Sequence, residues 1–181
     1  MNTRLGAHPV HVQNMHNFIH IEASGLGAGS YPIEIGVALA SGDRRCTLVC
    51  PPVDWVHWDA GAERAPSLAR DNLLLSGRSV LKVALLLNEW LGDETVYSNA
   101  WGNDVVWLEA LFRRAGVQQR CTVETVNVLL HSAEPLAWQL ASARLAAQDP
   151  TVRWRASNQA QRLQEAVQML GNAGMPVQAA F

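Results

Sequence analysis

Alternation of apolar and polar residues along the first third of the chain predicts a small sheet. The first segment alternates around Phe18, Ile19 and Ile21, as expected of a central strand. Gly42 and Asp43 supply the turn residues of a hairpin between the second and third segments. The predicted strands cover residues 17–22, 31–40 and 44–49.

Helical spacing of apolar residues dominates the rest of the chain. Gly92 and Gly116 are the expected ends of two helices, because glycine accepts the left-handed conformation that follows a last turn. Residues 95–98 predict a short strand between those helices. The predicted helices cover residues 79–91, 104–115, 134–147 and 157–170. Three strands, a helix, a strand and three helices predict an α/β fold with a mixed sheet.

Composition indicates one globular domain. The 181 residues are 49% hydrophobic and 17% charged, which is enough to bury a core. We expect residues 1–16, which carry His8, His11 and His16, to be a flexible, solvated leader. Residues 17–175 would then form a single domain.

Charge and cysteine content restrict the possible partners and compartment. A net charge of −2 gives no broad basic surface, so any nucleic-acid binding must come from a local patch. No segment is apolar enough to cross a bilayer, so no membrane association is expected. The three cysteines (Cys46, Cys50 and Cys121) are odd in number and lack CxxC spacing, which favours the cytoplasm.

The segment NFIHIEASGLGAGSYPIEIG, residues 17–36, carries the clearest motif. It resembles the first motif of the DEDD (DEDDh-type) 3'-5' exonuclease superfamily, which includes the proofreading subunit of bacterial DNA polymerase III and RNase T. In that family an apolar strand carries Asp-x-Glu and leads into a turn ending Gly-Leu. Glu22, Gly25 and Leu26 match the motif here, but His20 occupies the Asp position. The resemblance implies an RNase H-like exonuclease fold, with helices flanking a mixed central sheet.

A second motif lies in TVYSNAWGNDVVWLEALFRRAG, residues 95–116. Asp104 stands at the predicted helix start, where the family keeps an Asp, and Trp107–Leu108 matches the letters that follow. By itself, Asp104 is equally expected as an N-cap or first-turn carboxylate that interacts with the helix dipole. The resemblance implies instead that Asp104 is a former metal ligand.

The third motif is altered at both of its functional positions. The family pattern His-Arg-Ala-x-x-Asp-Ala aligns best with residues 154–160, which places Trp154 at the general base and Gln159 at the last metal ligand. An alternative alignment starts at His131 and puts Leu136 at the Asp position. Either alignment leaves the site short of carboxylates.

These changes predict that no catalytic set is intact. Two-metal hydrolysis requires convergent carboxylates and a base for the attacking water, and His20, Trp154 and Gln159 mark the degenerate positions. We expect a catalytically inactive module that binds single-stranded nucleic acid, nucleotide ends or a protein partner. No cofactor is expected unless the site survives, in which case Mn²⁺ or Mg²⁺ would bind. The alternative is an active enzyme in which His20, Glu22 and Asp104 hold one ion, such as Mn²⁺, and a histidine such as His57 or His131 acts as base.

Binding would use residues around the old cleft. The resemblance implies that Gly25 and Leu26 cradle a terminal nucleotide, Trp154 stacks on a base, and Arg155 contacts phosphate. Trp154 could equally fill an empty pocket. The family resemblance also implies a homodimer, and exposed tryptophans could form an aromatic contact patch; the candidates are Trp55, Trp58, Trp90 and Trp101.

Overall fold

The computed structural model describes residues 15–62, 68–130, 138–139, 143 and 155–172. The strands are β1 (Asn17–Ala23), β2 (Pro32–Ala38), β3 (Arg44–Leu48), β4 (Thr95–Ser98) and β5 (Thr122–Thr125). The helices are α1 (Arg70–Ser76), α2 (Val80–Leu91), α3 (Trp101–Ala115) and α5 (Ala156–Asn172), with 3₁₀ turns η1 (Ala60–Ala62) and η3 (Val126–Leu129).

The five described strands form one mixed sheet in the order β3-β2-β1-β4-β5. The first three strands are antiparallel neighbours, whereas β4 and β5 run parallel to β1. The register places Glu22 directly opposite Glu34 on β2. The predicted α/β class with a mixed sheet is therefore confirmed.

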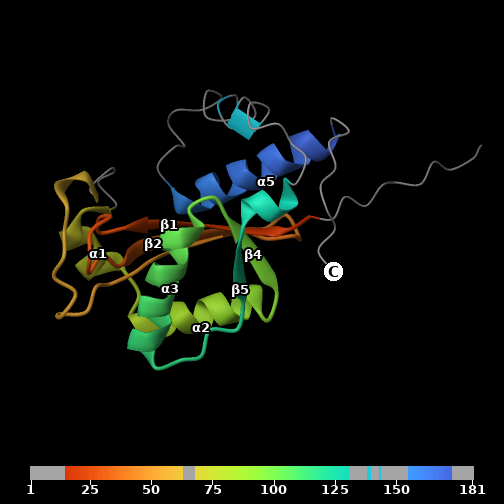
Figure 1. Ribbon diagram of the computed structural model, residues 1–181. Coiled ribbons are helices and arrows are strands. Elements are labelled where there is room, and N and C mark those ends of the chain that lie inside the picture. Colours follow the sequence, from red (N-terminus) through yellow and green to blue (C-terminus); the bar gives the residue numbers. More distant parts are fainter. Residues whose placement is uncertain (1–14, 63–67, 131–137, 140–142, 144–154, 173–181) are drawn as a thin grey trace, which may run out of the picture.

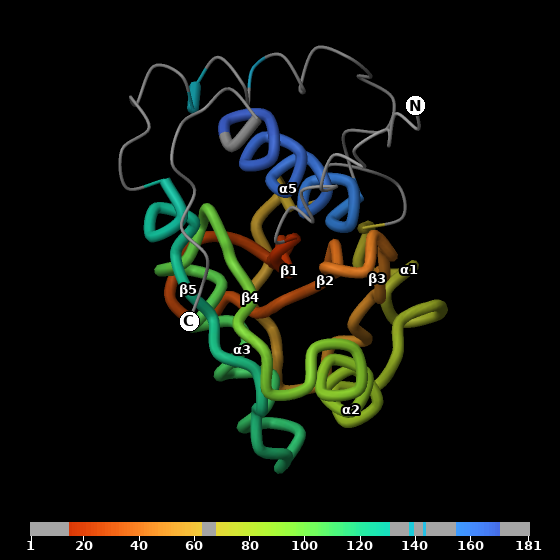
Figure 2. Tube along the Cα trace, turned by 90° about the vertical axis from the view of Figure 1, so that its right-hand side faces the viewer, coloured from red at the N-terminus to blue at the C-terminus, as the bar shows by residue number. Residues whose placement is uncertain are grey.

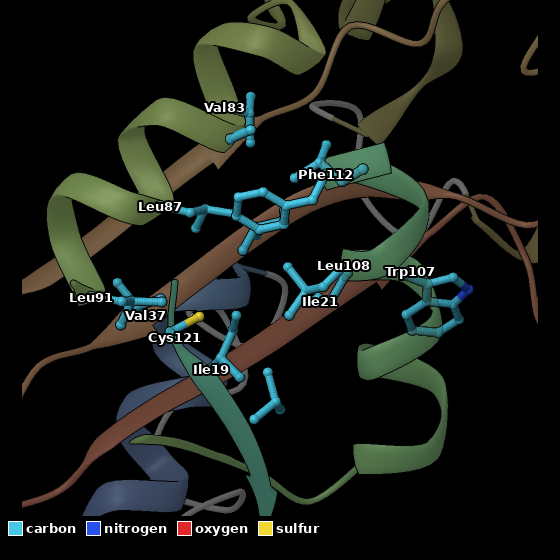
Figure 3. Close-up of a cluster of buried hydrophobic side chains, with 14 of the residues drawn as sticks. Ile19, Ile21, Val37, Val83, Leu87, Leu91, Trp107, Leu108, Phe112 and Cys121 are labelled. Atoms are coloured by element: carbon cyan, nitrogen blue, oxygen red, sulfur yellow. The ribbon is translucent and has the colours of Figure 1, made fainter. Parts of the chain in front are cut away.

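Helices cover both faces of the sheet. In Figure 1, α5 crosses one face while α2 and α3 lie against the other, and the turned view in Figure 2 shows the same three layers. Successive side chains of a strand point to opposite faces, so Ile19 and Ile21 enter the core with α2 and α3, while Phe18 packs on the α5 side. Figure 3 shows Ile21 beside Leu108 of α3 in this core.

The predicted ends of the helix over residues 79–91 agree with the structure, whereas the predicted start of the helix over residues 104–115 is wrong. Helix α2 begins after Ser79, whose Oγ accepts a hydrogen bond from the Lys82 N–H at 3.3 Å, and ends at Gly92 with φ +56°. Helix α3 starts at Trp101 rather than at Asp104, because Ala100 is its N-cap residue. The prediction therefore missed the first turn of this helix. That turn contains Gly102 and polar Asn103, so it does not show the helical spacing of apolar residues.

Two elements were absent from the prediction. Strand β5 has four residues and a single buried side chain, Val123, so its sequence shows too little alternation to be recognised. Helix α1 has seven residues, which is fewer than an isolated helix needs, and its stability comes from burying Leu73. Most of the helix predicted over residues 134–147 lies outside the described residues, with residues 138–139 and 143 helical.

His16, which was expected to be solvated, packs against the domain. The ring of His16 meets Tyr97 edge-on at 5.2 Å between centroids, and the His16 carbonyl accepts a hydrogen bond from Gln164 Nε2 at 3.0 Å. His16 is therefore attached to the domain rather than solvated. Residues 1–14, with His8 and His11, lie outside the described residues.

Three of the four tryptophans proposed for a contact patch pack into the fold. Trp55 stacks on Tyr31 at 4.8 Å, Arg70 lies 5.6 Å over the Trp58 ring, and Trp90 packs against the main core. Trp101 is 47% exposed, and its Nε1–H donates to the Val123 carbonyl at 2.9 Å. The four side chains therefore do not form one exposed aromatic surface. No helix in the described part of the chain is both long and apolar enough to cross a membrane.

Helix α5 is attached to the sheet through the buried side chain of Glu34. Glu34 Oε2 accepts the Ala156 backbone N–H at 2.9 Å, and Oε1 pairs with Arg155 Nε at 2.7 Å. The Cys46 thiol also donates to Oε1, at 3.3 Å. A β carbon on Gly36 would lie 2.0 Å from the backbone nitrogen of Ser157, so only glycine permits this close approach. A carboxylate from β2 thus caps the N-terminus of α5 and complements its dipole.

We predict that Glu34→Ala lowers the free energy of unfolding by about 3 kcal/mol, because a buried N–H and a cation lose their shared acceptor. Glu34→Gln keeps one acceptor oxygen and should cost less. Urea denaturation followed by tryptophan fluorescence measures both changes. The control Glu109→Ala, on the exposed face of α3, should stay within about 0.5 kcal/mol of wild type. Equal effects of Glu34→Ala and Glu109→Ala would contradict the capping role.

Candidate functional site

A pocket of about 370 Å³ opens at the end of β1. Its walls come from β1, the turn after it, the loop before η1 and the first turn of α3. The larger and polar side chains that line it are those of His20, Glu22, Leu26, Asp59, Asn103 and Trp107. The structure thus brings the first and second sequence motifs together in one cavity.

His20 and Glu22 lie on the same face of β1, two residues apart. His20 Nε2 is 3.3 Å from Glu22 Oε1, and both side chains are largely buried. The intervening Ile21 points to the opposite face and anchors the strand in the core. The alternation of the strand therefore fixes the imidazole beside the carboxylate.

Asp104 approaches this pair from α3 and is fully buried. Its Oδ2 accepts the Ser98 hydroxyl at 2.5 Å, and Ser98 Oγ accepts the Ala100 N–H at 2.9 Å. Burial raises the pKa of Asp104 to about 6; the Ser98 bond and the charge of His20 act to lower that pKa, and the charge of Glu22 acts to raise it. Asp104 is a carboxylate of the first turn of the helix, as one of the sequence alternatives predicted, and it is not the N-cap, which is Ala100. It interacts electrostatically with both His20 and Glu22.

Two buried polar atoms of this cluster lack a hydrogen-bond partner within the described residues. They are Asp104 Oδ1 and His20 Nδ1. A buried polar atom without a partner costs free energy, and such atoms concentrate at sites that are kept for something other than stability. The cluster is therefore a candidate site as well as part of the fold.

The turn after β1 depends on Gly25. Its φ is +155°, and a β carbon there would lie 2.1 Å from Asp59 Oδ2 and 2.6 Å from His57 Cε1. The Asp59 N–H donates to the Ser24 carbonyl at 2.8 Å, which holds the loop over the end of β1. Gly25 thus lets residues 57–59 close over the turn.

Asp59 was not recognised in the sequence, although it lines the pocket. It belongs to the loop that follows β3, and no spacing rule connects such a loop with β1. His57, which the sequence offered as an alternative base, packs on the turn with Nδ1 3.3 Å from Ser30 Oγ and Nε2 3.7 Å from Asp59 Oδ1. Leu26 is 76% exposed at the pocket mouth, where a ligand could contact it.

The third motif is only partly described. Gln159 lies half-buried on α5. Arg155, predicted to contact phosphate, pairs instead with Glu34, so part of its guanidinium is already engaged. Trp154 and His131 fall outside the described residues. The nucleic-acid roles of Trp154 and Arg155 stay predictions.

The side chains that the structure describes do not fit a pair of divalent ions. Such a pair requires several carboxylate oxygens that face one another. Over residues 15–62, 68–130, 138–139, 143 and 155–170, no three His, Cys, Asp or Glu side chains are grouped so that they could hold a metal ion. His20 already contacts Glu22, and Asp104 already accepts from Ser98. Glu22 and Asp104 share a site as expected, and metal binding by them stays a prediction.

Comparison with known proteins identifies the fold. No protein-family model matches the chain, and no curated protein matches it. Among solved structures, E. coli Exonuclease I in complex with a 5cy-dT13 oligonucleotide aligns over 87% of this chain with a TM-score of 0.63 and 11% identity. The product-bound structure of exonuclease I aligns over 87% with a TM-score of 0.57 and 11% identity.

The zinc-bound E. coli ExoI–ssDNA complex aligns over 88% of this chain, with a TM-score of 0.53 and 10% identity. The chain covers 40%, 46% and 39% of these three chains, respectively, so it spans well under half the length of each. At such low identity the likeness establishes the fold alone. The exonuclease-type, RNase H-like fold that the motifs implied is thereby confirmed.

We predict that Asp104 makes stability depend on pH. Its folded pKa of about 6 lies above the ordinary 3.8, so the folded state holds the proton more tightly than the unfolded state. Stability from this group is therefore present below about pH 4 and is lost as the pH rises through about 6. Two units of pKa shift correspond to about 3 kcal/mol.

Urea denaturation of Asp104→Asn between pH 4 and 7 tests this expectation. The variant should lack the loss of stability that the wild type shows over that interval. Asp54→Asn, at an exposed carboxylate, should keep the wild-type pH dependence. Parallel curves for wild type and Asp104→Asn would show that Asp104 titrates normally.

Proposed function

We propose that this domain is a catalytically inactive exonuclease-like module that holds the terminal nucleoside of a single strand in the pocket at the end of β1. The observation that supports this most strongly is the chemical character of the pocket. It combines the apolar side chains of Leu26 and Trp107 with the polar groups of Glu22 and Asn103. Its volume of about 370 Å³ lies within the range of ~300–1,000 Å³ typical of small-ligand sites.

The base and the sugar of a nucleoside are chemically complementary to the side chains that line the pocket. A nucleobase offers a flat apolar face, which suits Leu26 and the edge of Trp107. Sugar hydroxyl groups can donate to the Glu22 carboxylate and exchange hydrogen bonds with the Asn103 amide. The structural neighbours include complexes of E. coli Exonuclease I with dT13 and dA13 oligonucleotides, which agrees with a strand end as the ligand.

The pocket chemistry does not favour phosphate. Among the described residues that line it there is no Lys or Arg, whereas Glu22 and Asp59 both contribute carboxylates. A phosphate beside them would be repelled unless a cation intervened. We therefore expect the base and sugar to enter the pocket while the backbone leads away from it. Binding should depend only weakly on salt, because few phosphates are neutralised.

The residues at the catalytic positions of the motifs support the proposed inactivity. His20 replaces an acidic ligand, and Gln159 offers an uncharged amide at the last ligand position of the favoured alignment. Loss of a general base costs on the order of 10²–10⁴ in rate. Loss of the metal removes several kcal/mol of charge stabilisation in the transition state. Together these losses would leave hydrolysis negligible.

A second candidate function is one-metal hydrolysis. The 3.3 Å approach of His20 Nε2 to Glu22 Oε1 is the observation that favours it, since a nitrogen and an oxygen ligand together suit Mn²⁺ or Zn²⁺. Asp104 would have to move to complete the set, because no three such side chains of the described residues are grouped to hold an ion. Within the described residues, His57 is the candidate base nearest the pocket, and it is held on the turn by Ser30 and Asp59. A homodimer, a protein partner and a cytoplasmic location stay predictions from the sequence.

We predict that Leu26→Ala weakens binding of a short single-stranded oligonucleotide about fivefold, because about 1 kcal/mol of apolar contact is lost. Fluorescence anisotropy of a dye-labelled dT oligonucleotide measures the affinity. Leu75→Ala is the matched control, since Leu75 is also highly exposed but lies on α1 and does not line the pocket. Equal affinities of the two variants would place the binding surface elsewhere.

We also predict no cleavage of single- or double-stranded DNA or RNA by the wild-type protein with Mg²⁺ or Mn²⁺. Gel analysis of end-labelled strands over several hours provides the readout. A ladder of products that disappears in Glu22→Gln would establish the one-metal enzyme instead. Products that persist in Glu22→Gln would identify a contaminating nuclease.

A further inference from the structure

The imidazole of His20 lies where it can neutralise the acidic cluster. His20 Nε2 is 3.3 Å from Glu22 Oε1, and its charge also interacts with buried Asp104. Of the other pocket-lining side chains in the described part of the chain, none can carry a positive charge. Two carboxylates in a confined site repel one another unless a donor or a cation lies between them. In this pocket the imidazole is the group placed to meet that requirement.

We propose that His20 occupies the place of a divalent cation, so that the pocket is assembled and binds its ligand without metal. The inference rests on the proposed function for the identity of that ligand. An imidazole N–H at Nε2 donates to Glu22 in the neutral ring as well as in the charged one. The arrangement therefore does not require a change of protonation.

The alternative, that His20 is itself a metal ligand, conflicts with the geometry. Coordination through Nε2 would break the contact with Glu22, which is the other candidate ligand on β1. Coordination through Nδ1 would need an ion beside a nitrogen that is buried and has no hydrogen-bond partner in the described structure. The contact of His20 with Glu22 thus replaces metal coordination at this point of the pocket.

Replacing His20 by an aspartate should allow the pocket to bind a divalent cation. In His20→Asp, the new carboxylate would join Glu22 and Asp104 with no imidazole to separate them. A second carboxylate next to Glu22 supplies hard oxygen ligands of the kind that Mn²⁺ and Mg²⁺ prefer. A bound ion would then relieve their mutual repulsion.

The test is titration of the protein with MnCl₂ by isothermal calorimetry, with thermal unfolding recorded in parallel. We expect no heat and no shift in Tm for the wild type. His20→Asp should give a saturable heat of Mn²⁺ binding and gain thermal stability with Mn²⁺. Asn103→Asp is the control, because it adds a carboxylate to the same pocket while His20 stays in place; it should gain no comparable affinity.

Several outcomes would overturn the inference. These are Mn²⁺ binding by the wild type as tight as by His20→Asp, no gain in His20→Asp, and an equal gain in Asn103→Asp. Circular dichroism checks whether His20→Asp is folded. If it is not, His20→Ala tests the proposal in its place. Removal of the imidazole alone should expose Glu22 and raise the Mn²⁺ affinity above that of wild type. Unchanged affinity in His20→Ala would contradict the proposal.

The titrations contain no nucleic acid, so their result is independent of whether strand binding is observed. Anisotropy of the dT oligonucleotide in EDTA and in Mg²⁺ adds the functional readout. Equal affinities in the two buffers are expected for wild type. Binding that disappears in EDTA would overturn metal independence while supporting the proposed function. Absence of binding in both buffers would contradict the proposed function. The role of His20 would then be tested by the Mn²⁺ titrations alone.

Discussion

Glu34 is a buried carboxylate in the middle of the sheet, and the placement of α5 depends on it. A carboxylate at that depth is costly unless each oxygen has donors, and both oxygens have them: the Ala156 N–H, the Arg155 guanidinium and the Cys46 thiol. Gly36, two residues further along β2, allows the helix backbone to approach closely. Together they position the start of α5 over the sheet. Gln159, the third-motif residue on α5, is therefore positioned through β2.

The pairing of β1 with β2 and β4 controls the other half of the site. Because β1 is buried on both faces, a slip of one residue would exchange its core side with its site side. Ile19 and Ile21 lock the strand against α2 and α3, which leaves His20 and Glu22 facing the pocket. The Ser98–Asp104 hydrogen bond then joins the end of β4 to α3. The charged cluster is thus held by apolar packing and by one short polar contact.

The electrostatics of the pocket distinguish it from a two-metal centre. Such a centre gathers carboxylates whose repulsion is relieved by bound ions. Here Asp104 is buried with a raised pKa, Glu22 contacts an imidazole, and the cavity-lining residues that the structure describes include no Lys or Arg. These features suit an uncharged ligand with a flat apolar face and hydroxyl groups. The proposed binding of a nucleoside rests on these features.

The sequence by itself determined the mixed sheet, the helices α2 and α5, and the glycine turn that follows the strand with Glu22. Alternation, helical spacing and turn residues are local signals, so they can be recognised without the tertiary structure. Only the tertiary structure decided which side chains meet. It showed that α3 begins before Asp104, that β5 completes the sheet edge, and that Asp59 reaches the pocket. It also showed that Arg155 binds Glu34. Contacts of this kind join residues far apart in the chain, and their geometry depends on how the layers pack rather than on any local spacing.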